Sequence, residues 1–521
     1  MVLNRCVQPS LTLQYFSCAR NHLEVSLAAS PVVNSPASSS VTAPRATNRC
    51  TYRACGNWTA SERTTGVTAS FIEFFTKKIV APDHPARNGL LQENAAFLQP
   101  LVAALGRQPI LFDNFDENAP FLELDYCLFD LSEAFTAPST YLNDIALWQA
   151  RFRQIARHLK INAYASVFVR NRDDHGQLVP IAWQFARTIG QILTLKDEKI
   201  GCENDATSPA AQTAPQEGVW CTRQNAVYCL NFRRDESSPP PDLWEPRPIT
   251  KRQQQPKRAS ALKTPESPRS AWLIVKPPPR EKGVLLHPAK FPETLVEIFL
   301  NDFSQPGDRI FDPMAGTGST LLAALARQRE AYGIELNPQF HRIARERITR
   351  YLPSLPNLLE SSNWKLVCGD AAEATNYTEF PPAFDYIITS PPYWDMLRMK
   401  GAETQQKRKD AGLLQFYSDD ARDLGNVTDY RSFLDNLVKI YRFVATRLAP
   451  GGYFTIIVKN VKKRGVIFPL AWDLALQLSD ELQLCHEQFW CQDDQKLAPF
   501  GYRYAWVSNT FHHYCLHFRK P

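Results

Sequence analysis

The chain has 521 residues, of which 44% are hydrophobic, and its 59 basic and 53 acidic side chains give a net charge of +6. This length favours two domains with linkers, and the modest positive charge is compatible with a nucleic-acid partner without requiring one. No apolar run reaches the roughly 18 residues of a membrane-spanning helix, and the 12 cysteines form no CxxC pair or metal-ligand spacing, so we expect a cytoplasmic protein with free thiols, no membrane contact and no metal.

Three segments of the chain have the composition of tails or linkers. Residues 1–68 are rich in Ser, Ala, Thr, Arg and Asn and poor in acids, which fits a disordered tail, an organelle-targeting segment or a start site placed too early. Residues 205–216 are polar, and residues 235–270 are rich in Pro, Ser, Lys and Arg and cannot bury enough apolar surface to fold. We therefore expect two folded blocks, residues 69–234 and residues 271–521.

An internal repeat relates the two blocks. Residues 141–202 align with residues 430–491 at a constant offset of 289, without a gap, and 16 of these 62 pairs are identical. The match resumes between residues 220–233 and 506–519 at an offset of 286, and upstream of the long match the offset is 260. An ungapped match of this length, with its end preserved, predicts an internal duplication.

Short apolar, β-branched runs in the C-terminal block predict buried parallel strands. These runs are residues 309–311, 332–335, 365–368, 385–389 and 453–458. Apolar residues at helical spacing predict a helix over residues 430–448, which the Pro-Gly-Gly sequence at 450–452 stops. Alternating strands and helices predict an α/β fold, with ligand-binding residues gathered where the strands end.

A glycine-rich turn follows the first of these strands and reads DPMAGTGST from Asp312 to Thr320. Gly316 and Gly318 allow the backbone to bend tightly and to approach a ligand, with the N–H groups of the next helix facing it. No lysine follows the glycines, which excludes a triphosphate-binding P-loop. Glu335 ends the second strand and Asp370 follows the third, so a ribose and an adenine amino group would meet suitable acceptors.

The fourth strand runs into Ser390-Pro391-Pro392-Tyr393. The two prolines stiffen the turn, and the carbonyl of Pro391 stays outside helix and ladder pairing. Together with the Ser390 hydroxyl, this carbonyl can accept two hydrogen bonds from an –NH2 group and direct the nitrogen lone pair at an electrophile. Tyr393 offers an aromatic face to a base that has left its stack. The sequence thus predicts chemistry on an exocyclic amino group.

In these motifs the C-terminal block resembles the amino-methyltransferases that modify cytosine N4 or adenine N6 in DNA. The HPAKFP segment at 287–292 is similar to a further cofactor-side motif of that family. The resemblance implies a Rossmann-like methyltransferase fold, S-adenosyl-L-methionine as cofactor, DNA as partner and a restriction system as a compatible context. Cofactor contacts are implied for Asp312, Pro313, Ala315, Gly316, Gly318, Glu335, Asp370, Lys290 and Phe291, and target-base contacts for Ser390, Pro391, Pro392 and Tyr393.

Serine at the first position of the target motif is similar to the cytosine-N4 group of the family. Methylation of adenine N6 in DNA and of a base amino group in RNA stay open as alternatives. A protein that binds nucleic acid without catalysis is the alternative from another class, and the intact DPMAGTGST and SPPYW motifs argue against it.

Basic and aromatic residues near the target motif predict contacts with nucleic-acid phosphates and bases. One directly follows the target motif, some lie in residues 398–427, a segment that the N-terminal copy lacks, and others follow the fifth strand. They are Trp394, Lys400, Lys407, Arg408, Lys409, Lys459, Lys462 and Lys463.

The N-terminal copy has lost the target motif. In place of residues 390–394 it reads Asp130-Leu-Ser-Glu-Ala134, without the prolines or the aromatic side chain, and no glycine-rich turn precedes it. We expect residues 69–234 to form a degenerate, partial methyltransferase fold that packs on the catalytic half or extends its substrate surface. Methyl transfer would then occur at one site per chain.

Overall fold

The computed structural model describes residues 123–135, 137, 139–203, 220–223, 226–236, 268–275, 291–354, 364–392, 394, 420, 422–463, 465–491 and 512–521. It also describes residues 99 and 103 and the short strands at 11–12, 14–15, 24–25, 55–58, 87–91, 108–112, 500–502 and 505–507. The predicted linker at 205–216 and most of the one at 235–270 lie outside these residues. No helix among them is long and apolar enough to cross a membrane.

The C-terminal half is built on an eight-stranded sheet. In spatial order its strands are β13 (Trp272–Ile274), β21 (Gln483–Cys491), β24 (His512–Arg519), β18 (Leu448–Val458), β17 (Phe384–Thr389), β14 (Arg309–Asp312), β15 (Glu330–Glu335) and β16 (Trp364–Cys368). The strands from β18 to β16 are parallel, and β24 runs antiparallel to both of its neighbours. Sequence order reverses between β14 and β17, which is the switch point where such sheets bind ligands. This confirms the predicted Rossmann-like α/β fold.

Helices cover both faces of this sheet. They are α6 (Glu293–Phe303), α7 (Ser319–Ala326), α8 (Pro338–Tyr351), α10 (Tyr430–Thr446) and α11 (Leu470–Leu478). Alternate residues of a strand face opposite sides, so Ile387 of β17 joins the core under α10 whereas Tyr386 and Ile388 join the core of α6 and α7. The predicted helix ends at Thr446, and the Pro-Gly-Gly sequence lies inside β18 rather than in a loop.

The N-terminal half contains a second sheet whose strand order matches the first. Beyond β2 (Gln14–Tyr15), its strands are β4 (Cys55–Trp58), β11 (Thr194–Glu203), β12 (Ala226–Arg233), β8 (Leu159–Val169), β7 (Leu124–Asp130), β5 (Arg87–Leu91) and β6 (Gln108–Phe112). From β4 to β6 they occupy the places of β13 to β15, with the same parallel and antiparallel pairings. Strands β5 and β6 thus supply the places of β14 and β15, where the sequence showed no match.

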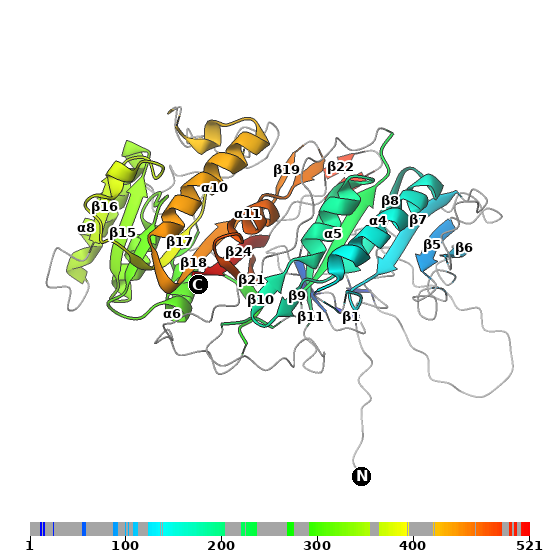
Figure 1. Ribbon diagram of the computed structural model, residues 1–521, viewed down its shortest axis with the longest axis horizontal. Coiled ribbons are helices and arrows are strands. Elements are labelled where there is room, and N and C mark those ends of the chain that lie inside the picture. Colours follow the sequence, from blue (N-terminus) through cyan, green and yellow to red (C-terminus); the bar gives the residue numbers. More distant parts are fainter. Residues whose placement is uncertain are drawn as a thin grey trace, which may run out of the picture.

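Two helices and a hairpin complete the correspondence. Helices α4 (Tyr141–His158) and α5 (Ile181–Gly190) pack on the N-terminal sheet as α10 and α11 pack on the other (Figure 1). The hairpin of β9 (Arg172–Asp174) and β10 (Gln177–Val179) corresponds to that of β19 (Val461–Lys463) and β20 (Val466–Phe468). The two hairpins lie at opposite edges of the molecule (Figure 1), so the carboxyl edges of the two sheets point in opposite directions.

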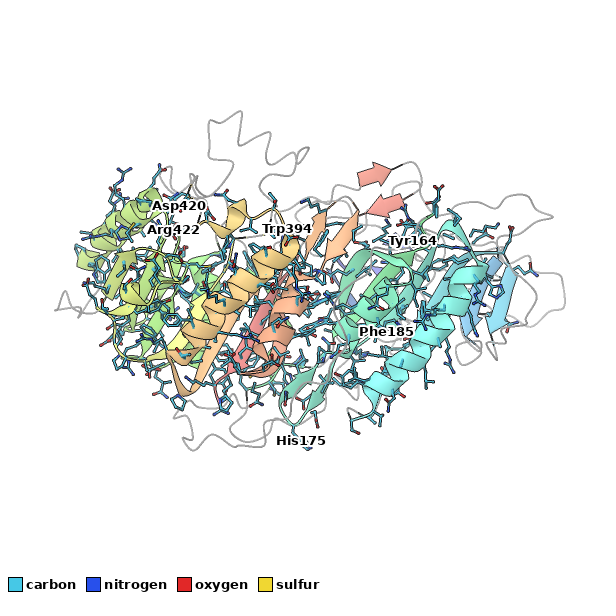
Figure 2. All side chains as sticks on the ribbon, turned by 45° about the horizontal axis from the view of Figure 1, so that its top comes forward. Tyr164, His175, Phe185, Trp394, Asp420 and Arg422 are labelled. Atoms are coloured by element: carbon cyan, nitrogen blue, oxygen red, sulfur yellow. The ribbon has the colours of Figure 1, made fainter. Side chains whose placement is uncertain are left out.

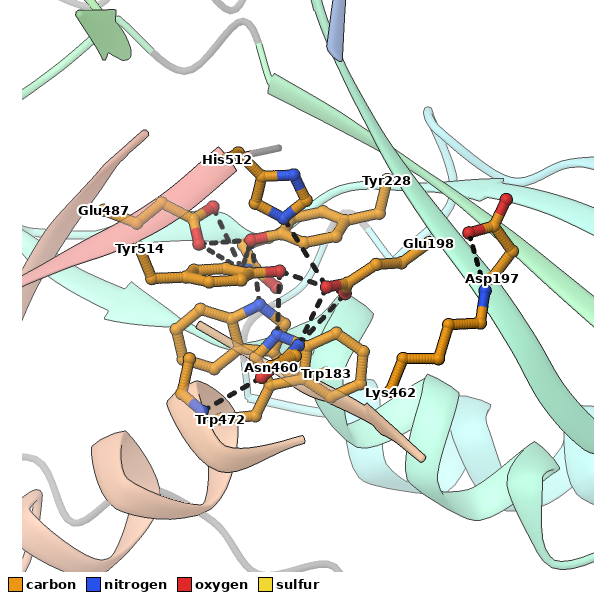
Figure 3. A network of polar contacts seen from close by, with 12 residues as sticks. Trp183, Asp197, Glu198, Tyr228, Asn460, Lys462, Trp472, Glu487, His512 and Tyr514 are labelled. Carbon is orange, nitrogen blue, oxygen red and sulfur yellow. Dashed lines mark hydrogen bonds and ion pairs between the residues drawn. The ribbon is translucent and has the colours of Figure 1, made fainter. Parts of the chain in front are cut away.

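Reciprocal hydrogen bonds join the two halves. The side-chain amide of Asn171 donates to Glu487 at 3.1 and 3.2 Å, and that of Asn460 donates to Glu198 at 3.0 and 3.1 Å. Each asparagine and each glutamate is related to its counterpart by the duplication offset of 289. All four side chains are buried, and the same bond is therefore made twice across the contact. Figure 3 shows the pair of Asn460 and Glu198.

Aromatic side chains at the centre of the contact follow the same relation. The Trp183 and Trp472 rings stack with centroids 6.4 Å apart and planes 10° apart. Their indole nitrogens donate to the hydroxyls of Tyr228 and Tyr514, respectively, at 2.8 and 3.0 Å. The halves are thus related by an approximate two-fold axis that passes near the tryptophan pair (Figure 3).

Candidate active site

The ends of β14, β15, β16 and β17 bring the predicted site residues to one edge of the C-terminal sheet. Asp312 is the last residue of β14 and pairs in register with Gly333 of β15, while Glu335 pairs with Cys368 of β16. Ser390 follows Thr389, the last residue of β17. The glycine-rich turn and the SPPY turn therefore flank the switch point of the sheet.

The glycine-rich turn needs its glycines. Gly316 has φ +54° and Gly318 has φ +79°, both in the left-handed region that side chains disfavour. A Cβ atom on Gly318 would lie 3.1 Å from the Cβ of Ala344 in α8. The turn thus packs its backbone directly on α8, and α7 begins immediately after Gly318.

Asp312 connects the two turns. Its buried carboxylate accepts hydrogen bonds from the Met314 amide at 3.0 Å, the Thr320 hydroxyl at 2.6 Å and the Thr389 hydroxyl at 2.8 Å. Burial raises the pKa of Asp312 from 3.8 to about 6, although these hydrogen bonds act in the opposite direction. One carboxylate therefore fixes the glycine-rich turn, the start of α7 and the strand that leads to Ser390.

Glu335, the last residue of β15, forms hydrogen bonds to two turns. It accepts hydrogen bonds from the amides of Gly316 at 2.7 Å and Asn337 at 2.8 Å, and burial raises its pKa from 4.5 to about 7. Asp370 is partly exposed, and its carboxylate accepts from the Ala372 amide at 2.8 Å. Both acids lie at the predicted edge, where Glu335 joins the glycine-rich turn to the turn after β15 and Asp370 supports the turn after β16.

The remaining cofactor-side residues are placed in part. Phe291 precedes α6 and is partly buried against the core of α6 and α7. Ala315 is buried, and its amide donates to the Ile334 carbonyl at 2.8 Å. Pro313 is buried in the turn that follows β14, whereas Lys290 lies outside the described residues.

Side chains of α6 and α8 that were not predicted from the sequence form hydrogen bonds to the glycine-rich turn and to the start of α7. Arg347 of α8 donates to the Thr317 carbonyl and, at 2.7 Å, to Glu293 of α6. Glu293 also accepts from the Ser319 hydroxyl at 3.1 Å. The basic side chain lies nine residues into α8, and only the tertiary fold reveals its partners.

In the SPPY turn, Pro391 is buried and Ser390 and Pro392 are partly buried, while Tyr393 lies outside the described residues. Trp394 is buried, with 3% of its surface exposed, and its indole nitrogen donates to the Thr428 carbonyl at 3.2 Å. A buried indole cannot stack on a nucleic-acid base, so the prediction that Trp394 contacts nucleic acid is wrong for this conformation. Figure 2 shows Trp394 at the edge opposite His175 of the N-terminal half.

The predicted basic surface is also reduced. Lys462 lies 3.3 Å from Asp197 of the N-terminal half with 16% of its side chain exposed, so it belongs to the contact between the halves and not to a phosphate-binding surface. The Lys463 ammonium lies 4.4 Å from the centroid of the Trp394 ring, and Lys459 is partly buried at the end of β18. Four further predicted residues lie outside the described residues: Lys400, Lys407, Arg408 and Lys409.

Comparison with known proteins identifies related sequences. Residues 129–346 match a family model described as DNA methylase. The matched span begins in β7, includes the glycine-rich turn and Glu335, and ends in α8, before the SPPY turn.

Three proteins illustrate these relatives. The orphan methyltransferase M.BamHII of Bacillus amyloliquefaciens is 35% identical over 86 residues, which cover 16% of this chain and 32% of that protein. The putative methylase YubD of Escherichia coli is 33% identical over 78 residues, covering 15% of this chain and 34% of that one. The DNA adenine methyltransferase YhdJ of Escherichia coli is 36% identical over 62 residues, covering 12% and 21%. The chain thus spans about a third or less of the length of these relatives.

Proposed function

Because this chain belongs to the family of N4- and N6-specific DNA amino-methyltransferases, we propose that it transfers a methyl group from S-adenosyl-L-methionine to an exocyclic amino nitrogen of a DNA base. One observation carries the proposal. The Asp312 carboxylate joins the glycine-rich turn to Thr389, directly before Ser390, across the switch point of the sheet. A cofactor turn and an amine-binding turn are thereby held at one site.

The residues present fit the cofactor. The left-handed glycines leave the turn without side chains, as close approach of a ligand requires, and Glu335 places a buried carboxylate at the end of β15, where dinucleotide folds bind ribose. Gly316, Gly318 and Asp312 would hold the methionine part and Asp370 the adenine. When bound, the cofactor supplies an electrophilic methyl group on a sulfonium centre.

The target turn would act on the amine by orientation. The Pro391 carbonyl and the Ser390 hydroxyl each accept one N–H of the target amino group, which aims the nitrogen lone pair at the methyl group. Tyr393 would stack on the base once it has left the helix. No covalent intermediate is required, so catalysis comes from positioning and from fixed dipoles.

The target is most consistent with cytosine N4, because serine stands first in the SPPY motif. Adenine N6 in DNA is the second candidate, since one relative is a DNA adenine methyltransferase. A base amino group in RNA is the third candidate.

We further propose that residues 69–234 are a degenerate, non-catalytic copy packed on the catalytic half at 271–521, with a linker at 235–270. The matching strand order supports this. In the N-terminal copy, the Arg172 guanidinium donates to the carbonyls of Ser132 and Ala134 at 2.9 and 3.1 Å. At an offset of 260 these correspond to residues 392 and 394, so an arginine covers backbone acceptors in the loop that replaces the SPPY turn.

Labelled S-adenosylmethionine, incubated with the protein and with DNA or RNA, tests the proposal after digestion to nucleosides and identification of the product by mass. Label in 4-methylcytosine supports the first candidate, and label in N6-methyladenine of DNA supports the second. Label found only in RNA nucleosides overturns the DNA assignment. We expect joint replacement of Ser390 and Tyr393 by alanine to abolish transfer, and Asp130→Ala to leave it unchanged; the opposite result would reverse the roles of the two copies.

A further inference from the structure

A chain of contacts leads from the N-terminal half to Trp394, next to the SPPY turn. Arg187 of α5 forms an ion pair with Asp473 of α11, with 7% and 2% of their side chains exposed. The second oxygen of Asp473 accepts a hydrogen bond from the Tyr430 hydroxyl at 2.6 Å. The Tyr430 ring meets the Trp394 ring edge-on, with centroids 5.1 Å apart.

A second chain of contacts reaches the same indole from another side. Asp197 of β11 pairs with Lys462 in β19, and β19 pairs with β20 so that Val461 lies opposite Phe468. Phe468 packs on Trp394 with ring centroids 4.6 Å apart. The hairpin that covers Trp394 is therefore attached to the N-terminal half.

The ion pair of Arg187 and Asp473 breaks the two-fold relation of the contact. The duplication places Leu476 at the position of Arg187 and Gln184 at that of Asp473, so the symmetry-related place holds no charge. It also places Ala134 at the position of Trp394. The Asn–Glu and Trp–Tyr contacts occur in both directions, whereas the buried ion pair occurs only on the side that leads to the SPPY turn.

We propose that the N-terminal half positions the target-amine turn of the catalytic half, with Arg187 as the principal positioning residue acting through Asp473, Tyr430 and Trp394. This inference rests on the proposed function. Removing one partner of a buried ion pair leaves an uncompensated charge, and here that charge also accepts the Tyr430 hydrogen bond. Without Arg187, Asp473 must gain water or a proton, and the hydrogen bond that holds Tyr430 against Trp394 changes with it.

Full-length Arg187→Gln tests this role, with Arg187→Lys as the conservative variant. Asp173→Ala is the matched control, because Asp173 also contacts the other half, at 2.7 Å from His486. It lies in the β9–β10 hairpin, whose turn residue His175 is at the edge opposite Trp394 (Figure 2). We expect Arg187→Gln to lower kcat on DNA at least tenfold with the dissociation constant for S-adenosylmethionine unchanged within twofold. Arg187→Lys should recover most of this loss, and Asp173→Ala should leave kcat within twofold at any temperature where it is folded.

Amide hydrogen exchange provides a readout that does not depend on the substrate. Peptides containing Trp394 should exchange faster in Arg187→Gln than in the unchanged protein or in Asp173→Ala, also if the protein methylates no DNA. Equal exchange in all three proteins, or a loss of kcat in both variants that merely follows their loss of melting temperature, overturns the positioning role. Failure of the unchanged protein to methylate any nucleic acid, with the exchange difference present, overturns the proposed function and keeps the positioning role.

Discussion

Replacing Asp312 by Asn tests the electrostatics of the site. The buried carboxylate has its pKa raised from 3.8 to about 6, and at about 1.4 kcal/mol per pKa unit this difference corresponds to about 3 kcal/mol. Asparagine keeps the shape: its carbonyl can accept from the Met314 amide and the Thr389 hydroxyl, and its NH2 group can donate to the Thr320 hydroxyl, which can also accept. The variant therefore resembles the protonated acid.

The pH dependence gives this prediction a definite sign. A carboxyl group whose pKa is raised by folding contributes stability that is fully present below about pH 3.8 and is lost as pH rises through about 6. At pH 8 we expect Asp312→Asn, without cofactor, to be more stable than the unchanged protein by up to about 3 kcal/mol. The difference should fall to roughly half of that at pH 5 and to about 0.5 kcal/mol at pH 4.

Urea unfolding followed by circular dichroism at pH 4 to 8 measures this difference, and calorimetry at pH 8 measures cofactor binding. Because Asp312 is among the residues proposed to hold the methionine part of the cofactor, we expect affinity for S-adenosylmethionine to fall by about 10- to 100-fold, as for a hydrogen bond to a charged group. A variant that is less stable at pH 8, or a stability difference that stays constant with pH, would refute the assigned electrostatics.

Three further variants probe the same edge of the sheet. Gly318→Ala should cost about 1–2 kcal/mol of stability, since φ is +79° and the new Cβ would crowd Ala344; an unchanged melting temperature would contradict the observed backbone conformation. Thr389→Val should cost about 1.5–3 kcal/mol, because the hydroxyl that bonds the buried Asp312 carboxylate is lost; urea unfolding checks this, and a neutral effect would mean that the bond is not formed. Lys459→Ala should weaken DNA binding and lower the slope of log affinity against log salt by about 0.9 if it contacts one phosphate; an unchanged slope removes Lys459 from the nucleic-acid surface.

Local sequence was sufficient for the strands that end at the proposed active site. Strands predicted at 309–311 and 385–389 appear as Arg309–Asp312 and Phe384–Thr389, because apolar runs bounded by turn residues depend on neighbours along the chain. The common edge of these strands followed from parallel order. By contrast, strands β5 and β6 were not foreseen, since neither retains a motif of its counterpart.

The errors arose where a side chain meets the other half of the molecule. By sequence, Lys462 and Trp394 fit a basic, aromatic nucleic-acid surface. In the structure Lys462 pairs with Asp197, and Trp394 is covered by Phe468 of the hairpin to which Lys462 belongs. Sequence did contain a signal for this contact. Glu198 and Glu487 are identical across the repeat although the residues on either side of them differ between the copies, and a charge retained in both copies indicates a shared partner.

The stacked Trp183 and Trp472 lie near the approximate two-fold axis between the halves. Because both halves belong to one chain, substitutions can act on one side of this axis alone. In a dimer of two identical chains, any substitution at the interface appears twice. A new arginine would then be present on both sides of the two-fold axis, and each copy would need an acidic partner. With both halves in one chain, a substitution appears once. Arg187 could thus be placed opposite Asp473 without placing a second arginine against Gln184. The contact can therefore differ on its two sides, as the proposed positioning of one half by the other requires.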